Sequence, residues 1–98
     1  MSPEIQSRLT RNGIQIAAET KTHYLLVRDD CIALVERTGA GFGSIGSTGM
    51  MTEKGLAFLV LREGRALLAA KGSEVEAAAL QVQTIRRFSA DLKSALEG

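Results

Sequence analysis

The strands that this sequence predicts are apolar on both of their faces, which narrows the folds open to a chain of 98 residues. Leu56–Arg62 and Arg65–Ala70 flank Glu63-Gly64, a two-residue turn in which Gly supplies a positive φ. One face of this hairpin holds Phe58, Val60, Leu67 and Ala69, and the other holds Ala57, Leu59, Leu61, Ala66, Leu68 and Ala70. An antiparallel sheet with one face in water alternates apolar and polar residues instead. Both faces of this sheet therefore need a cover.

An earlier pair of segments has the same character. Thr22–Arg28 and Cys31–Arg37 are separated by Asp29-Asp30. One face of this hairpin holds Tyr24, Leu26, Ala33 and Val35, and the other holds Leu25, Val27, Ile32 and Leu34. Asp-Asp lacks the glycine that two-residue turns favour, so we expect a looser turn here. With Ile14–Glu19 added, the sequence predicts an antiparallel β-meander of four to five strands between residues 14 and 70.

Two helices are predicted beside the meander. Ser2-Pro3-Glu4 is a typical helix start and Asn12-Gly13 a typical stop, which predicts a short N-terminal helix over residues 2–12. Ser73–Glu76 has the pattern of a capping box ahead of a long helix over residues 74–97. One apolar stripe runs along that helix through Val75, Ala78, Val82, Ile85, Ser89, Leu92 and Leu96. We expect one α+β domain over residues 1–98, with the long C-terminal helix packed on one face of the sheet.

The second face of the sheet then lacks a cover within one chain, because the N-terminal helix is too short to span it. A second copy of the chain can cover this face, or the sheet can curl over its own core. We predict a homodimer. The corresponding function is a small non-enzymatic interaction or dimerisation module, whose partner is a second copy and possibly another protein.

Residues 38–49 change the character of the sequence, since they hold half of its 10 glycines, and we expect a glycine-rich loop. The segment 41–46 matches G-x-G-x-x-G, but no helix is predicted after it to face a dinucleotide pyrophosphate. The alternative function is a small-ligand or anion site, in which amides and hydroxyls of the loop form a nest. Its residues would be Gly41, Gly43, Ser44, Gly46, Ser47 and Thr48. A flexible connection between the two hairpins explains the same glycines without a ligand.

Few side chains offer catalytic chemistry. The chain has one His and one Cys, whereas a structural zinc site needs about four such ligands. His23 would lie opposite Glu36 in a two-residue hairpin and is the candidate base near neutral pH. Cys31 would lie beside Arg28, whose charge lowers a thiol pKa, although a small buried hydrophobe is the simpler interpretation. We predict no enzyme, no cofactor and no metal.

The charges are balanced, with Lys+Arg 12 against Asp+Glu 11. This gives no support to a nucleic-acid or membrane-surface partner. Arg62 and Arg65 would be directly opposed at a hairpin tip, which is unfavourable unless an acidic group is near, and we expect them to be solvated. The segment 1–6 lacks the pattern of a signal peptide, and the apolar run 56–61 is too short to span a bilayer. We therefore predict a cytoplasmic protein.

Overall fold

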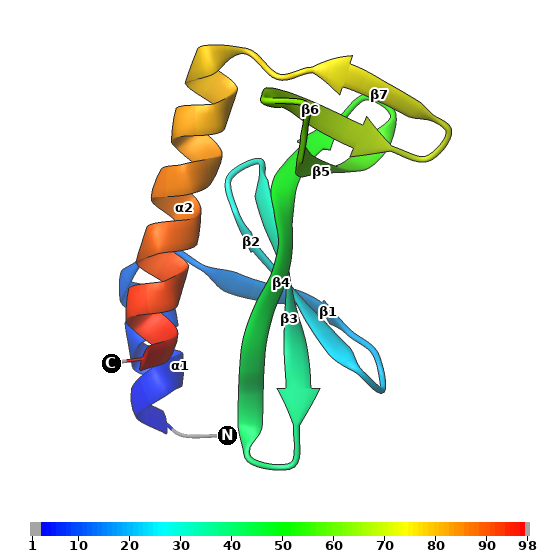
Figure 1. The fold of residues 1–98 in the computed structure, drawn as a ribbon. Coiled ribbons are helices and arrows are strands. Elements are labelled where there is room, and N and C mark those ends of the chain that lie inside the picture. Colours follow the sequence, from blue (N-terminus) through cyan, green and yellow to red (C-terminus); the bar gives the residue numbers. More distant parts are fainter. Residues whose placement is uncertain (1–2, 98) are drawn as a thin grey trace.

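The computed structural model describes residues 3–97, which form two helices and one seven-stranded antiparallel sheet (Figure 1). The strands pair in chain order, so the sheet is a simple meander. The α+β class is confirmed, but the strand count is higher than the four to five predicted. The elements are α1 (Pro3–Arg11), β1 (Gln15–Glu19), β2 (His23–Arg28), β3 (Cys31–Thr38), β4 (Gly41–Thr52), β5 (Gly55–Arg62), β6 (Arg65–Ala70), β7 (Ser73–Glu76) and α2 (Ala79–Glu97).

The long strand β4 joins two parts of the sheet. It pairs with β3 over nearly its whole length, but only its last residues, Gly49 to Thr52, pair with β5. In Figure 1 the strands β5–β7 therefore lie beyond the upper end of β4, while β3 runs along β4 with β2 and β1 following it. The helix α2 runs alongside both parts.

The strand β4 corrects the prediction of a glycine-rich loop. Two register shifts put an extra β4 residue opposite Leu34 and another opposite Glu36, so the strand contains two bulges. A glycine lies at each bulge, and a third, Gly49, lies where β5 approaches most closely. A Cβ on Gly49 would collide with the carbonyl oxygen of Ala57. The glycines thus allow bulges and a close strand contact that larger residues would block.

The strand β7 corrects the predicted start of the long helix. Ser73 and Glu76 pair with Ala70 and Leu67 of β6 instead of capping a helix. The helix begins six residues later than Ser73, at Ala79. Its first turn is capped by Gln81, whose Oε1 accepts a hydrogen bond of 2.8 Å from the backbone N–H of Ala78. This is the return half of a capping box, three residues into the helix.

The predicted packing of the long helix on one sheet face is confirmed. Ile85, Phe88, Leu92 and Ala95 of α2 are buried. The C-terminal part of α2 packs with α1 and β2–β3 in a cluster that includes Leu9, Ile14, Tyr24, Leu26, Ala33 and Val35. Near its start, Ile85 packs with Ala57 and Leu68 in a second cluster. Val75, which the sequence predicts on the helix stripe, lies on β7 instead and is 51% exposed.

The short helix α1 packs against α2. A helix of this length needs such tertiary contacts, because it is only marginally stable alone in water. Its end follows the pattern predicted by Gly13, whose φ is +71°. The N–H of Gly13 bonds to the carbonyl of Thr10, and the N–H of Ile14 bonds to that of Leu9. This pair of bonds is a Schellman motif, and Leu9 and Ile14 are both buried beside it. The predicted N-cap, Ser2, lies outside the described residues.

Both predicted hairpin turns are present. Glu63 and Gly64 have φ of +51° and +77°, as a primed two-residue turn requires. The turn at Asp29-Asp30 is also a two-residue turn, because Arg28 pairs directly with Cys31, so the expectation of a looser turn was wrong. Asp29 adopts φ +53°, a region that Asp enters more easily than most residues. Within residues 3–97, no helix is long and apolar enough to cross a membrane.

Candidate functional site

Within residues 3–97, no helix covers the sheet face opposite α2, which is here called the helix-free face. The register places ten apolar residues on it, namely Leu25, Val27, Ile32, Leu34, Met51, Leu56, Phe58, Val60, Leu67 and Ala69. Neither core cluster includes any of them. Only Ile32 is buried, whereas Met51 and Leu56, which oppose each other, are 48% and 36% exposed. The other seven side chains are half-buried, so this face is only partly covered within the described chain.

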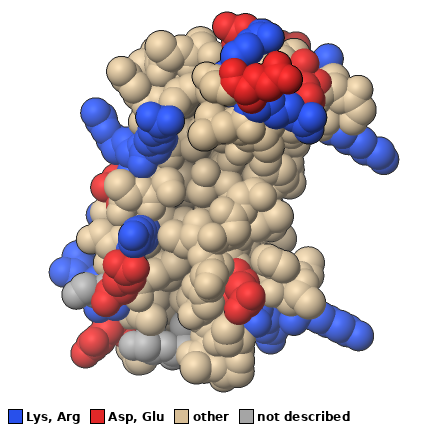
Figure 2. Space-filling view, viewed as in Figure 1, with Lys and Arg blue, Asp and Glu red and all other residues tan. Residues whose placement is uncertain are grey.

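Charged side chains border the helix-free face at β5–β7. The pairing puts Arg62 directly opposite Arg65, as predicted. The strand β7 supplies the acidic groups, since Arg62 contacts Glu74 at 2.8 Å and Arg65 contacts Glu76 at 2.6 Å. Figure 2 shows red and blue side chains mixed at the upper right, over the β5–β7 part of the molecule. The border thus carries both signs of charge.

A groove of about 650 Å³ lies between β4 and the C-terminal part of α2 and is here called the β4–α2 groove. It contains four of the six residues predicted for the nest, Gly43, Ser44, Gly46 and Thr48. Gly41 lines a different hollow, beside Tyr24 and Arg37. Ser47 is exposed to solvent on β4. The segment that brings these residues together is a strand, and whether they bind a ligand stays a prediction.

The charges in the β4–α2 groove are Glu36, Lys93 and Glu97. A Cβ on Gly43 would lie 2.8 Å from Oε1 of Glu36, so this glycine leaves the space that the carboxylate occupies. No ion pair involving these three side chains is found within residues 3–97. Two carboxylates and one ammonium give the groove a net negative charge, which sequence reasoning missed because Lys93 and Glu97 lie far along the chain.

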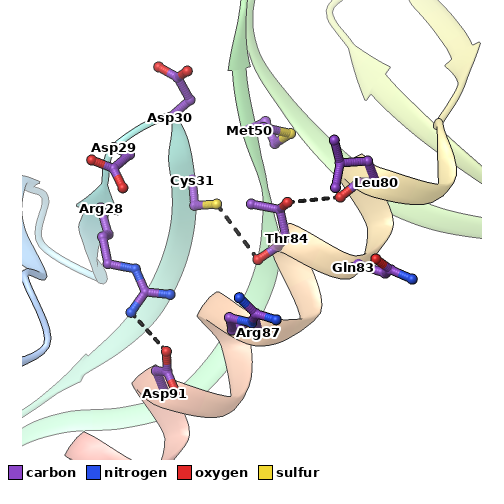
Figure 3. Close-up of a pocket in the computed structure, with 10 residues that line it drawn as sticks. All are labelled: Arg28, Asp29, Asp30, Cys31, Met50, Leu80, Gln83, Thr84, Arg87 and Asp91. Atoms are coloured by element: carbon purple, nitrogen blue, oxygen red, sulfur yellow. Dashed lines mark hydrogen bonds and ion pairs between the residues drawn. The ribbon is translucent and has the colours of Figure 1, made fainter.

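The thiol of Cys31 lines a second cavity, of about 520 Å³, between the β2–β3 turn and α2 (Figure 3). Its Sγ donates a weak hydrogen bond of 3.9 Å to the carbonyl of Thr84. Arg28 lies on the same side, where its guanidinium contacts Asp91 at 2.9 Å. Burial raises the pKa of Cys31 above 9.0, and the charge of Arg28 opposes this only in part. The thiol is therefore protonated at neutral pH and is a poor nucleophile.

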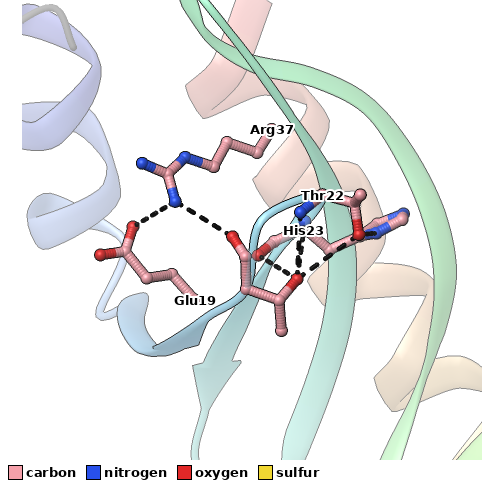
Figure 4. A network of polar contacts seen from close by, with 5 residues as sticks. Glu19, Thr22, His23 and Arg37 are labelled. Carbon is pink, nitrogen blue, oxygen red and sulfur yellow. Dashed lines mark hydrogen bonds and ion pairs between the residues drawn. The ribbon is translucent and has the colours of Figure 1, made fainter.

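His23 lies opposite Glu36 as predicted, but the two side chains share no hydrogen bond. The ring nitrogen Nδ1 of His23 lies 2.9 Å from Oγ1 of Thr22 instead (Figure 4). Nearby, Arg37 contacts Glu19 at 3.4 Å and donates to the carbonyl of Thr20. These contacts tie together the ends of β1, β2 and β3. Among residues 3–97, no three side chains of His, Cys, Asp or Glu gather as a metal site would require.

Comparison with protein-family models, with curated proteins and with solved structures found no significant match to this chain.

Proposed function

We propose that this chain is a small interaction module that forms a homodimer through its helix-free face. The observation that carries the proposal is the row of half-buried and exposed apolar side chains on that face. Phe58 gives the row an aromatic residue of the kind that anchors protein interfaces. A face of this kind is unfavourable in water and promotes association.

The exposed area supports a second copy as the occupant. A compact monomer of 10.5 kDa exposes about 5,400 Å². This chain exposes 6327 Å², an excess of about 900 Å². One partner in a standard interface buries about 800 Å², so the excess is enough for one such interface.

The charges also suit a two-fold pair of identical chains. In a two-fold interface the same surface of both copies is used, so a contact of residue i with residue j recurs as a contact of j with i. The border of the helix-free face carries arginines and glutamates, so a second copy can oppose unlike charges there. The formal net charge of +1 adds little repulsion between copies.

A non-enzymatic role fits the positions of the two reactive side chains. Cys31 lines the cavity beside α2, whereas the register places His23 on the opposite face of the sheet. They therefore do not share a site. That the module lacks a cofactor, binds no nucleic acid or membrane and acts in the cytoplasm are further predictions of this proposal.

Sedimentation equilibrium tests the proposal at chain concentrations of about 1 to 50 μM, a range that covers micromolar dissociation constants. The double variant Met51→Lys and Leu56→Lys puts two ammonium groups on the helix-free face at exposed positions. The control, Leu80→Lys, changes a residue that is 73% exposed on α2. We expect a dimer for the native chain and for the control, and a monomer for the double variant. A native chain that stays monomeric throughout, or a double variant that stays dimeric, would refute the proposal.

A further inference from the structure

Although β4 lies in the middle of the strand order, most of one of its edges is unpaired. Its residues 41–48 pair with β3 on one side, while β5 pairs only with residues 49–52 on the other. Within residues 3–97, no strand pairs with 41–48 on the side away from β3. In Figure 1 the lower half of β4 has β3 on one side and α2 on the other. The unpaired edge of β4 is therefore on the side of α2, where the β4–α2 groove lies.

The groove has the dimensions and lining of a peptide site. Its volume of about 650 Å³ falls within the usual range for ligand pockets, roughly 300–1,000 Å³. Ile45 and Leu96 supply apolar surface, and Ser44 and Ser89 supply hydroxyl groups. The stretch 43–48 of β4 that runs along the groove extends about 20 Å at roughly 3.3 Å per residue. This length matches an extended peptide better than a compact small molecule.

The charge of the groove selects among peptides. Its two carboxylates, Glu36 and Glu97, outnumber its single cation, Lys93. None of the three forms an ion pair within the described residues. A basic side chain on the ligand would gain an ion pair there, whereas an acidic ligand would meet two carboxylates. The carboxylate of Glu36 reaches the edge across Gly43, where any larger residue would displace it.

We propose that the β4–α2 groove binds an extended basic peptide segment of a partner protein, which adds a strand to the free edge of β4. Main-chain hydrogen bonds to β4 supply the affinity, and the carboxylates and apolar lining supply the selectivity. The two bulges of β4 twist the edge, which limits unspecific pairing with other chains. This site is separate from the proposed dimer face and extends the proposed function.

The experiment uses a phage-displayed library of random nonapeptides as the probe, selected against the full chain. We expect enriched peptides that alternate apolar residues and contain Lys or Arg. One enriched peptide is then synthesised with N-methyl groups on its odd-numbered residues, and again on its even-numbered residues. Because a strand directs alternate N–H groups to one neighbour, one methylated set should lose at least two hydrogen bonds to β4 and bind at least about thirtyfold more weakly, and the other should bind normally.

Two protein variants test the role of charge. Glu36→Gln with Glu97→Gln should weaken binding of the basic peptide about fivefold, since exposed ion pairs are worth 0.2–1 kcal/mol each, roughly. The matched control, Glu53→Gln with Glu63→Gln, removes two exposed carboxylates elsewhere and should leave the affinity unchanged. Amide NMR shifts on peptide addition should be centred on residues 42–48.

Three outcomes would overturn the proposal. The selection could yield no consensus, both methylated sets could bind like the parent peptide, or the shifts could fall outside β4 and α2. Protection of the amides of residues 42–48 by self-association alone would assign the edge to a second copy instead. The binding is also measured with the Met51→Lys, Leu56→Lys variant, so that failure of the dimer proposal and failure of this one remain distinguishable.

Discussion

The substitution Gly49→Ala tests how the two parts of the sheet are held together. The added Cβ would collide with the carbonyl oxygen of Ala57 and would lie 2.7 Å from Cα of Phe58. Both are backbone atoms of β5, so no side-chain rotation can relieve the clash. The strand β5 must move away, which opens the pairing of residues 49–52 with residues 55–58.

The expected loss of stability has two parts. Overpacking alone costs about 1–3 kcal/mol. Opening the β4–β5 ladder adds roughly 1 kcal/mol for each backbone hydrogen bond lost. It also disturbs the contact of Ala57 and Leu68 with Ile85, all of which are nearly fully buried. We expect a loss of about 4 kcal/mol or more out of the roughly 5–15 kcal/mol typical of a native domain.

Thermal unfolding followed by circular dichroism measures this loss. A change of about 4 kcal/mol lowers the Tm of a domain of this size by roughly 16 °C or more. Gly39→Ala is the control, because its added Cβ meets no atom within 4 Å and its φ is not positive. The control should change stability by less than about 0.5 kcal/mol. A Gly49→Ala chain that melts within a few degrees of the native chain, on the order of the control, would refute the close approach of β5 to β4.

Three further predictions concern single side chains. Ile85→Asp should abolish folding in circular dichroism, because it puts a carboxylate at a position that is 1% exposed among apolar neighbours; an unchanged melting curve would contradict the docking of α2. His23→Gln should change the free energy of unfolding by less than about 0.5 kcal/mol, since within residues 3–97 its ring bonds only to the exposed Thr22; a larger loss would assign it a structural role. The raised pKa of Cys31 means that its contribution to stability is present below pH 9.0 and is lost as the pH rises through the higher folded pKa. Urea unfolding from pH 7 to pH 10.5 or so should show this decline and Cys31→Ala should reduce it, whereas equal declines in both chains would assign it to other groups.

The sequence predicts the β5–β6 hairpin with the correct register, and it predicts the register of β2–β3 correctly once Asp29-Asp30 is taken as a two-residue turn. Each combines two runs of strand-forming residues with a turn of two residues, and this information is local. The pairing of His23 with Glu36 follows from that register, but their hydrogen bonding does not. The ring of His23 instead shares a hydrogen bond with the hydroxyl of Thr22, its neighbour in the chain. Register can therefore be predicted where side-chain partners cannot.

The strand β4 could not be predicted from local preference. Glycine lowers strand propensity, and five glycines between residues 39 and 49 favour a loop in any local interpretation. What requires them is the neighbouring structure, namely the carboxylate of Glu36 beside Gly43 and the backbone of Ala57 beside Gly49. These neighbours are defined only after β3 and β5 are in place. The β4–α2 groove was missed for the same reason, since its second wall comes from α2.

The mistaken start of the long helix had a signal that could have corrected it. Ser73–Glu76 fits a capping box, and Val75 is in phase with the helix stripe, but Glu-Val-Glu fits the alternation of a strand equally well. Arg62 opposite Arg65 is unfavourable unless acidic groups lie near. Two glutamates spaced by two residues on a further strand satisfy both arginines, which a helix starting at residue 74 would not do. The opposed arginines thus favour a strand over a helix for the Glu-Val-Glu segment. As the strand β7 beside β6, this segment brings one glutamate to each arginine.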